Sequence, residues 1–138
     1  MVRKIICNST FWILVLFAAL SLTAYAGSPK ADFGLFRLKN DSSSYIYSDT
    51  ASKTDAEESS GYCATVVVQG GDYISKGINM HVLNTKTGKV DSETIKVTKV
   101  KTYAINYSGT PTNTGKKLGG RKAGEFTQVM NVHGKWYP

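Results

Sequence analysis

The sequence predicts an all-β protein, with a small antiparallel β-sandwich as the expected architecture and a β-barrel as the alternative. Three features of the 138-residue chain lead to this prediction. Apolar and polar residues alternate with a period of two in several short segments. Clusters of Gly, Asn, Asp and Ser separate these segments. No ten-residue stretch after the first 26 residues shows the apolar period of a helix, so short strands are expected to build the core.

The beginning of the chain has the layout of a secretory signal peptide. Positive residues precede a short apolar core at 11–22 (FWILVLFAALSL), and Ala24 and Ala26 are the small residues that a cleavage site needs. The alternative is a membrane anchor, but a spanning helix needs about 20 apolar residues. The polar residues at 7–10 interrupt this stretch, so we expect cleavage after Ala26.

Cleavage would divide the chain into a signal peptide, 1–26, and a single all-β domain, 27–138. We expect this domain to be secreted and to contain no transmembrane segment. Cys63 is its one cysteine and lies in an apolar run, so we expect a buried thiol that packs as a small hydrophobic residue. An intermolecular disulfide is the alternative.

Three strands are expected in the first part of the domain. Residues 33–39 (FGLFRLK) form the first, and residues 45–47 (YIY) form a short second strand. The polar segment 48–61 is expected to be a surface loop, with one helical turn at 55–58. Residues 62–69 (YCATVVVQ) form the clearest strand because they are rich in β-branched side chains.

Further strands are expected after residue 72. The segment 73–83 is ambiguous at its start, where Gly77 indicates a bulge or bend, and then alternates as a strand does. Residues 84–89 (NTKTGK) form a turn. Residues 90–100 and then 103–107 alternate with a period of two, which is typical of half-buried strands.

The segment 108–124 has no large apolar residue except Leu118, so we expect a loop there, followed by a final strand at 125–136. The loop resembles the phosphate-binding motif GxxxxGK[ST] but lacks its working parts. Gly109 and Gly115 are separated by five residues rather than four, and a second lysine replaces the hydroxyl residue. No helical pattern follows, so we expect no nucleotide site.

Charge is distributed unevenly along the domain. The whole chain has a net charge of +7, yet residues 27–72 carry four bases and seven acids, whereas residues 73–138 carry eleven bases and three acids. This asymmetry indicates an anionic partner, with the solubility of exposed strand faces as the alternative. The tightest basic group is the expected anion-contact site: Lys116, Lys117, Arg121 and Lys122. No aromatic residues interleave with it, which argues against nucleic acid.

Aromatic residues are a second candidate for binding. Seven tyrosines lie in the domain, and tyrosine suits interfaces as well as ordinary strands. Trp136 and Tyr137 end the chain and are expected to be surface aromatics that dock on the sheet or insert at a lipid interface.

Residues that carry catalysis or bind metals are sparse. His81, His133 and Cys63 do not have the number or spacing of a structural zinc site. A cysteine–histidine pair is conceivable, but Cys63 lies inside an apolar strand. Carboxylates cluster mainly in the polar loop 48–61, which is a poor place to hold two carboxyls at a fixed separation. We therefore expect no catalytic residues, no metal and no cofactor.

Several motifs along the domain resemble a family of small secreted β-proteins from Gram-positive bacteria that includes the geobacillin-type large antimicrobial protein. The motifs are SDTASKTD (48–55), VLNTKTGKV (82–90), YAINYSG (103–109), GKKLGGRK (115–122) and VHGKWYP (132–138). The resemblance implies a small secreted β-sandwich with antibacterial or envelope-directed activity. It supplies no catalytic residues.

The function expected from these features is non-enzymatic binding of an anionic or carbohydrate cell-envelope surface, such as an anionic membrane or the cell wall. Bacteriocin-like antimicrobial action is its sharpest form. The first alternative is a protein–protein interaction or adhesion module that pairs through an exposed edge strand. The second alternative is a secreted enzyme or enzyme inhibitor.

Overall fold

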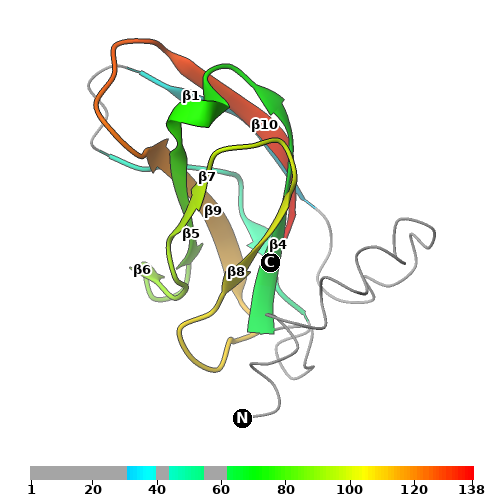
Figure 1. Ribbon diagram of the computed structural model, residues 1–138. Coiled ribbons are helices and arrows are strands. Elements are labelled where there is room, and N and C mark those ends of the chain that lie inside the picture. The colour runs from blue at the N-terminus through cyan, green and yellow to red at the C-terminus, as the bar shows by residue number, and fades with distance from the viewer. Residues whose placement is uncertain (1–30, 40–43, 55–61) are drawn as a thin grey trace, which may run out of the picture.

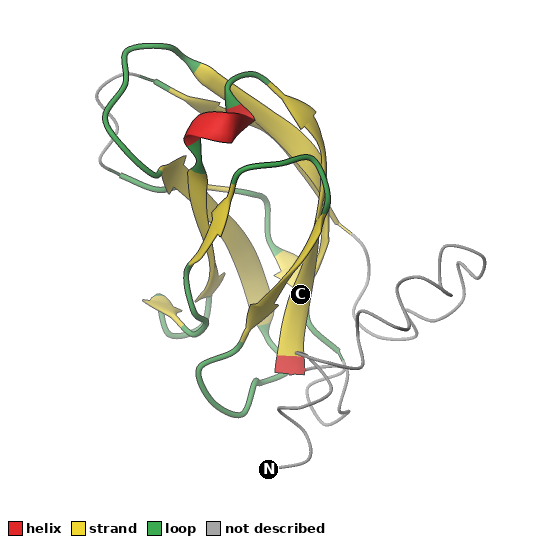
Figure 2. Cartoon of the chain, viewed as in Figure 1, coloured by secondary structure: helices red, strands yellow, loops and turns green. Residues whose placement is uncertain are grey.

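The structure is a computed structural model that describes residues 31–39, 44–54 and 62–138. These residues form ten strands and the short 3-10 turn η3 (Ile74–Lys76), and none of them lies in an α-helix (Figure 2). No helix in these ranges has the length and apolar character needed to cross a bilayer. The expected signal peptide, 1–26, and the expected helical turn, 55–58, lie outside the described residues.

The strands form two sheets, and every strand pair is antiparallel (Figure 1). Sheet A has the order β1-β10-β4-β8: β1 (Ala31–Leu38), β10 (Met130–Tyr137), β4 (Cys63–Gly71) and β8 (Thr102–Asn106). Sheet B has the order β2-β9-β5-β6: β2 (Ile46–Tyr47), β9 (Gly115–Lys122), β5 (Ile78–Asn84) and β6 (Lys89–Val90). Two short strands complete sheet B, with β3 (Ala51–Ser52) paired to β9 and β7 (Ile95–Val97) paired to β5.

Both sheets contribute side chains to one apolar cluster. Phe36, Val66 and Trp136 come from sheet A, and Met80 and Leu118 come from sheet B. Burial of large apolar side chains of this kind stabilises a fold by about 2 kcal/mol each. The all-β prediction is confirmed, and neither sheet closes into the barrel that was the alternative.

Most expected strands are present with shifted ends. The expected strand at 90–100 is wrong as a continuous unit, because it divides into β6 and β7. Between them Ser92 forms an isolated bridge with Tyr107, and its hydroxyl accepts a hydrogen bond from the Val82 amide at 2.8 Å. The Asp91 amide also donates to the Val82 carbonyl at 3.1 Å, so the segment stays beside β5 through single contacts rather than through a continuous strand ladder.

The largest correction concerns residues 115–122, which were expected to belong to a loop. They form β9, which pairs with β5 along seven residues and also with β2 and β3. The core-facing positions of β9 are Lys116, Leu118, Gly120 and Lys122, of which one is a large apolar residue. The sequence therefore lacks the apolar alternation by which strands are recognised.

Candidate binding face on sheet B

Strand alternation divides the predicted basic group into two pairs. Successive side chains of a strand point to opposite faces of the sheet. Lys117 and Arg121 lie on the outer face of sheet B and are half-buried, whereas Lys116 and Lys122 point into the protein. The structure thus places only Lys117 and Arg121, of these four residues, where an external anion can reach them.

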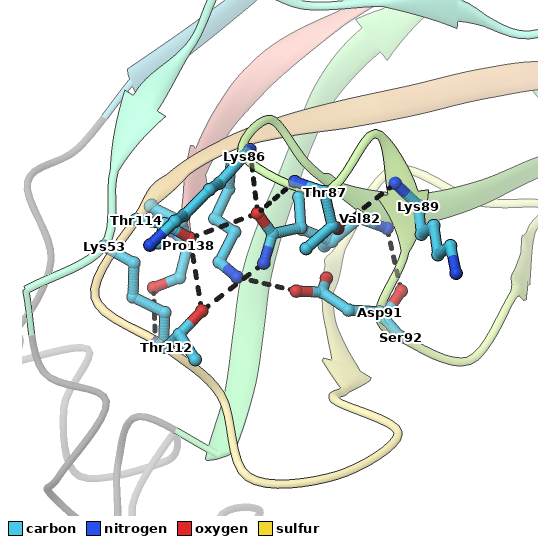
Figure 3. Close-up of polar contacts among 12 residues, drawn as sticks. Lys53, Val82, Lys86, Thr87, Lys89, Asp91, Ser92, Thr112, Thr114 and Pro138 are labelled. Carbon is cyan, nitrogen blue, oxygen red and sulfur yellow. Dashed lines mark hydrogen bonds and ion pairs between the residues drawn. The ribbon is translucent and has the colours of Figure 1, made fainter.

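Lys116 is fully buried and is neutralised inside the protein. Its Nζ lies 2.6 Å from Asp91 Oδ2 and 5.4 Å from the centre of the Tyr107 ring. Figure 3 shows Asp91 among other polar contacts in the same region of the protein. One of them is the hydrogen bond that Lys53 Nζ donates to the Pro138 carbonyl at 3.1 Å. The expected anion contact is therefore wrong for Lys116, because its charge already has a carboxylate partner.

Lys122 is also buried, and its ammonium group binds backbone carbonyls of the segment that follows β9. Its Nζ donates to the carbonyl oxygens of Phe126 at 3.0 Å and Gln128 at 2.7 Å, and it lies 4.5 Å from the centre of the Phe126 ring. These bonds hold residues 123–129 in a compact loop, which explains why the last strand begins at Met130 rather than at 125. The expected anion contact is wrong for Lys122 as well.

The two residues that were expected to be surface aromatics, Trp136 and Tyr137, also point to opposite faces of their strand. Trp136 pairs with Val66 in sheet A and is fully buried in the core. The prediction of a surface aromatic is therefore wrong for Trp136, because the end of the chain continues as a paired strand. Tyr137 points the other way and is half-buried.

A row of three residues crosses the outer face of sheet B. Tyr47 in β2 pairs with Gly119 in β9, and Gly119 pairs with His81 in β5. Because glycine has no side chain, the two rings meet above it, and the Tyr47 hydroxyl lies 3.0 Å from His81 Nε2. A Cβ on Gly119 would lie 2.7 Å from Tyr47 Cε1 and 2.9 Å from His81 Nε2, so an alanine would push the rings apart.

Tyr45 and Arg121 extend this row into a cluster. The Tyr45 ring packs on the His81 ring, with centres 3.9 Å apart, and lies beside Tyr47, with centres 6.3 Å apart. The Arg121 guanidinium lies 4.9 Å from the centre of the Tyr45 ring, which is the geometry of a cation–π contact. Arg121 thereby lies against the Tyr45 ring.

The surroundings of the cluster favour the neutral forms of Tyr47 and His81, with cationic side chains beside them. His81 is only 4% exposed, and burial lowers its pKa, with the charge of Arg121 lowering it further. Burial raises the pKa of Tyr47, and Tyr45 raises it further. At neutral pH the hydrogen bond therefore joins a neutral phenol and a neutral imidazole. Positive charge remains on Arg121 and Lys117, four residues apart along β9.

The binding-face residues that we name from the structure are Tyr45, Tyr47, His81, Lys117 and Arg121. Lys117 and Arg121 were predicted from the sequence, whereas Tyr45, Tyr47 and His81 were not predicted as a group. The sequence did contain a pattern that could have identified them. Tyr45 and Tyr47 alternate with Ile46, so they share one face of a strand. His81 shares a face with Asn79, while the residues that alternate with them point into the core. Among the described residues, no group of three or more His, Cys, Asp or Glu side chains could hold a metal ion.

Comparisons with known proteins give no further assignment. No family model matches the chain, and no curated protein or solved structure matches it.

Proposed function

We propose that this is a secreted, non-enzymatic protein that binds an anionic carbohydrate polymer of a cell envelope through the outer face of sheet B. The observation that carries the proposal is the placement of Arg121 against Tyr45, next to Tyr47 and above a buried histidine. This arrangement offers aromatic surface and positive charge within one patch.

The aromatic part suits a sugar ring. Tyrosine combines a flat apolar face, on which the C–H face of a sugar can pack, with a hydroxyl that bonds to sugar hydroxyls. Tyr45 and Tyr47 are partly accessible, whereas His81 is buried beneath them. We assign His81 a positioning role, in which it fixes the orientation of the Tyr47 hydroxyl.

The charged part suits an acidic group on that polymer. Lys117 and Arg121 lie on the same face at positions i and i+4, about 13 Å apart along an extended strand. A polymer that crosses the tyrosines can place one acidic group near each cation. Arg121 is the stronger candidate because a guanidinium binds carboxylates and phosphates with two parallel hydrogen bonds.

We also propose that the two sheets pack face to face as a β-sandwich. The shared apolar cluster supports this finer description, since it draws its members from both sheets. A sandwich would hold the outer face of sheet B rigid, so little conformational entropy would be lost when a polymer binds.

A binding experiment with three polymers tests the proposed function. Purified protein is titrated with dextran sulfate, with uncharged dextran and with polyglutamate, at low and at high salt. We expect dextran sulfate to bind most tightly, and the binding to weaken as salt rises. Equal binding of polyglutamate would mean that charge alone is recognised, and no binding of dextran sulfate at either salt would contradict the proposal.

A further inference from the structure

A different surface lies at one end of the domain, where three segments meet. Val97 of β7 pairs with Ile78, the Ala123 amide donates to the Gly77 carbonyl at 3.0 Å, and the Val68 amide donates to the Lys101 carbonyl at 3.0 Å. These contacts bring together the segments 71–77, 95–101 and 123–129, which we call the Tyr73 end. Figure 2 shows its helical turn, η3 (Ile74–Lys76), in red at the top of the view.

The two most exposed large hydrophobic residues among the described part of the chain lie at this end. Tyr73 is 49% exposed and Val100 is 57% exposed. A third exposed residue, Val90, is 44% exposed but pairs with Leu83 near the other end of β5, about 16 Å away along the strand. Val90 therefore serves as a natural control for exposure alone.

The backbone of Tyr73 is not explained by the turn that contains it. Its φ of 59° and ψ of 22° lie in the left-handed region, which glycine and asparagine adopt far more readily. The turn would form with less strain if residue 73 were glycine. A large aromatic side chain held in this conformation and exposed to solvent is a candidate for contact with a partner.

Val100 is presented by a loop that is fixed rather than loose. The Tyr103 hydroxyl accepts hydrogen bonds from the amides of Thr98 at 3.3 Å and Lys99 at 3.1 Å, and it donates to the Lys99 carbonyl at 3.0 Å. Val100 projects from this tethered loop between two exposed lysines, Lys99 and Lys101.

The Tyr73 end also carries an excess of positive charge. Its exposed lysines outnumber its exposed carboxylates by four to two: Lys76, Lys96, Lys99 and Lys101 against Asp72 and Glu125. In the segments 84–94 and 107–114 at the opposite end the excess is smaller, with two exposed lysines, Lys86 and Lys89, against one exposed carboxylate, Glu93. Exposed apolar residues flanked by lysines match the chemistry of an anionic bilayer surface, where the side chains enter the interface and the ammonium groups meet lipid phosphates.

We propose that the Tyr73 end docks on an anionic lipid bilayer, with Tyr73 and Val100 inserted at the interface and Lys99 and Lys101 on the headgroups. This contact is separate from the carbohydrate-binding face on sheet B and does not depend on it. The two proposals can therefore fail independently.

Vesicle binding tests the proposal with matched variants. Purified protein is sedimented with vesicles of phosphatidylcholine alone or mixed with phosphatidylglycerol, at low and high salt. We expect binding to the mixed vesicles, weakened by salt, and a loss of about tenfold in affinity for Tyr73→Gly and for Val100→Ser. Val90→Ser should bind as the original protein does. All variants carry the same N-terminus, so their differences report on the exchanged residue.

Two further readouts separate this role from a structural one. Tyr73→Gly should keep or raise the unfolding midpoint while it weakens vesicle binding, because the glycine relieves the left-handed strain. Val100→Trp should be quenched by brominated lipids more strongly than Val90→Trp, over the constant background of the two tryptophans that both variants share, Trp12 and buried Trp136. Absence of binding to phosphatidylglycerol vesicles, or equal losses for Val90→Ser and Val100→Ser, would overturn the proposal and leave a protein partner as the occupant of this end.

Discussion

Tyr47 and His81 are hydrogen-bonded across a strand that lies between them. Their atoms Oη and Nε2 are 3.0 Å apart because the intervening residue of β9 is Gly119, which has no side chain to separate them. The geometry of the candidate face therefore depends on a residue that makes no contact with a ligand itself.

Gly119→Ala should damage this face directly. The added methyl group would overlap both rings, so we expect the free energy of unfolding to fall by about 1–3 kcal/mol and carbohydrate binding to weaken. Chemical denaturation measures the first effect. Gly109→Ala is the matched control, because nothing lies within 4 Å of its Cβ position, and it should change stability by less than about 0.5 kcal/mol. Equal effects of the two variants would refute the role given to Gly119.

Acidification should destabilise the protein through His81. Because the folded state lowers the pKa of His81 below its ordinary value near 6.5, the unfolded chain binds a proton first as the pH falls. Stability from this residue is therefore complete above about pH 6.5 and declines as the pH falls toward the folded pKa. Urea midpoints measured from about pH 7.5 to about pH 5 should fall, and His81→Gln should flatten the dependence. If the urea midpoint of His81→Gln fell with pH as steeply as that of the original protein, another residue would be responsible for the pH dependence.

Neighbouring lysines of β9 should respond in opposite ways to substitution. Lys116→Ala removes the cation that faces Asp91, so we expect a loss of roughly 2 kcal/mol in the free energy of unfolding, since Asp91 is partly exposed. Lys117→Ala should leave stability within about 0.5 kcal/mol and weaken binding to dextran sulfate. Thermal unfolding and polymer titration on the same samples measure both. A stable Lys116→Ala variant with weakened binding would reverse the assignment.

Lys122 should control the loop that precedes the last strand. Lys122→Met keeps the apolar stem but leaves the carbonyls of Phe126 and Gln128 without their donor. We expect a loss of roughly 2 kcal/mol and faster hydrogen exchange in residues 123–129, with β4 less affected. Uniform acceleration of exchange throughout the described residues would show that Lys122 supports the whole fold rather than this loop.

The all-β class could be predicted because most strands alternate in the usual way. Residues 103–107 show it clearly, residues 62–69 are recognised by their β-branched side chains, and the observed strands β8 (Thr102–Asn106) and β4 (Cys63–Gly71) cover most of both segments. Strand β9 could not be predicted by the same rule, because lysines occupy two of its core-facing positions. Those lysines are tolerated only through partners distant in sequence or in a following loop, namely Asp91 and the carbonyls of residues 126 and 128.

The candidate site was predictable only in part for a related reason. Its cations, Lys117 and Arg121, were visible as a basic group, but the sequence does not state which members of that group face outward until the strand is recognised. The tyrosines and His81 come from strands far apart in the chain, and only their register with Gly119 brings them together. Trp136 was misplaced because the last strand reaches the end of the chain and buries it.

The most direct test of the account compares dextran sulfate binding by Arg121→Ala and Tyr47→Ala with that of Lys135→Ala. Lys135 is a half-buried basic residue on a central strand of the other sheet, so it controls for the loss of one charge. We expect the two sheet B variants to bind about tenfold more weakly while remaining folded, and Lys135→Ala to bind as the original protein does. Equal affinities for all four proteins, or a loss confined to Lys135→Ala, would contradict the claim that the outer face of sheet B is the binding site.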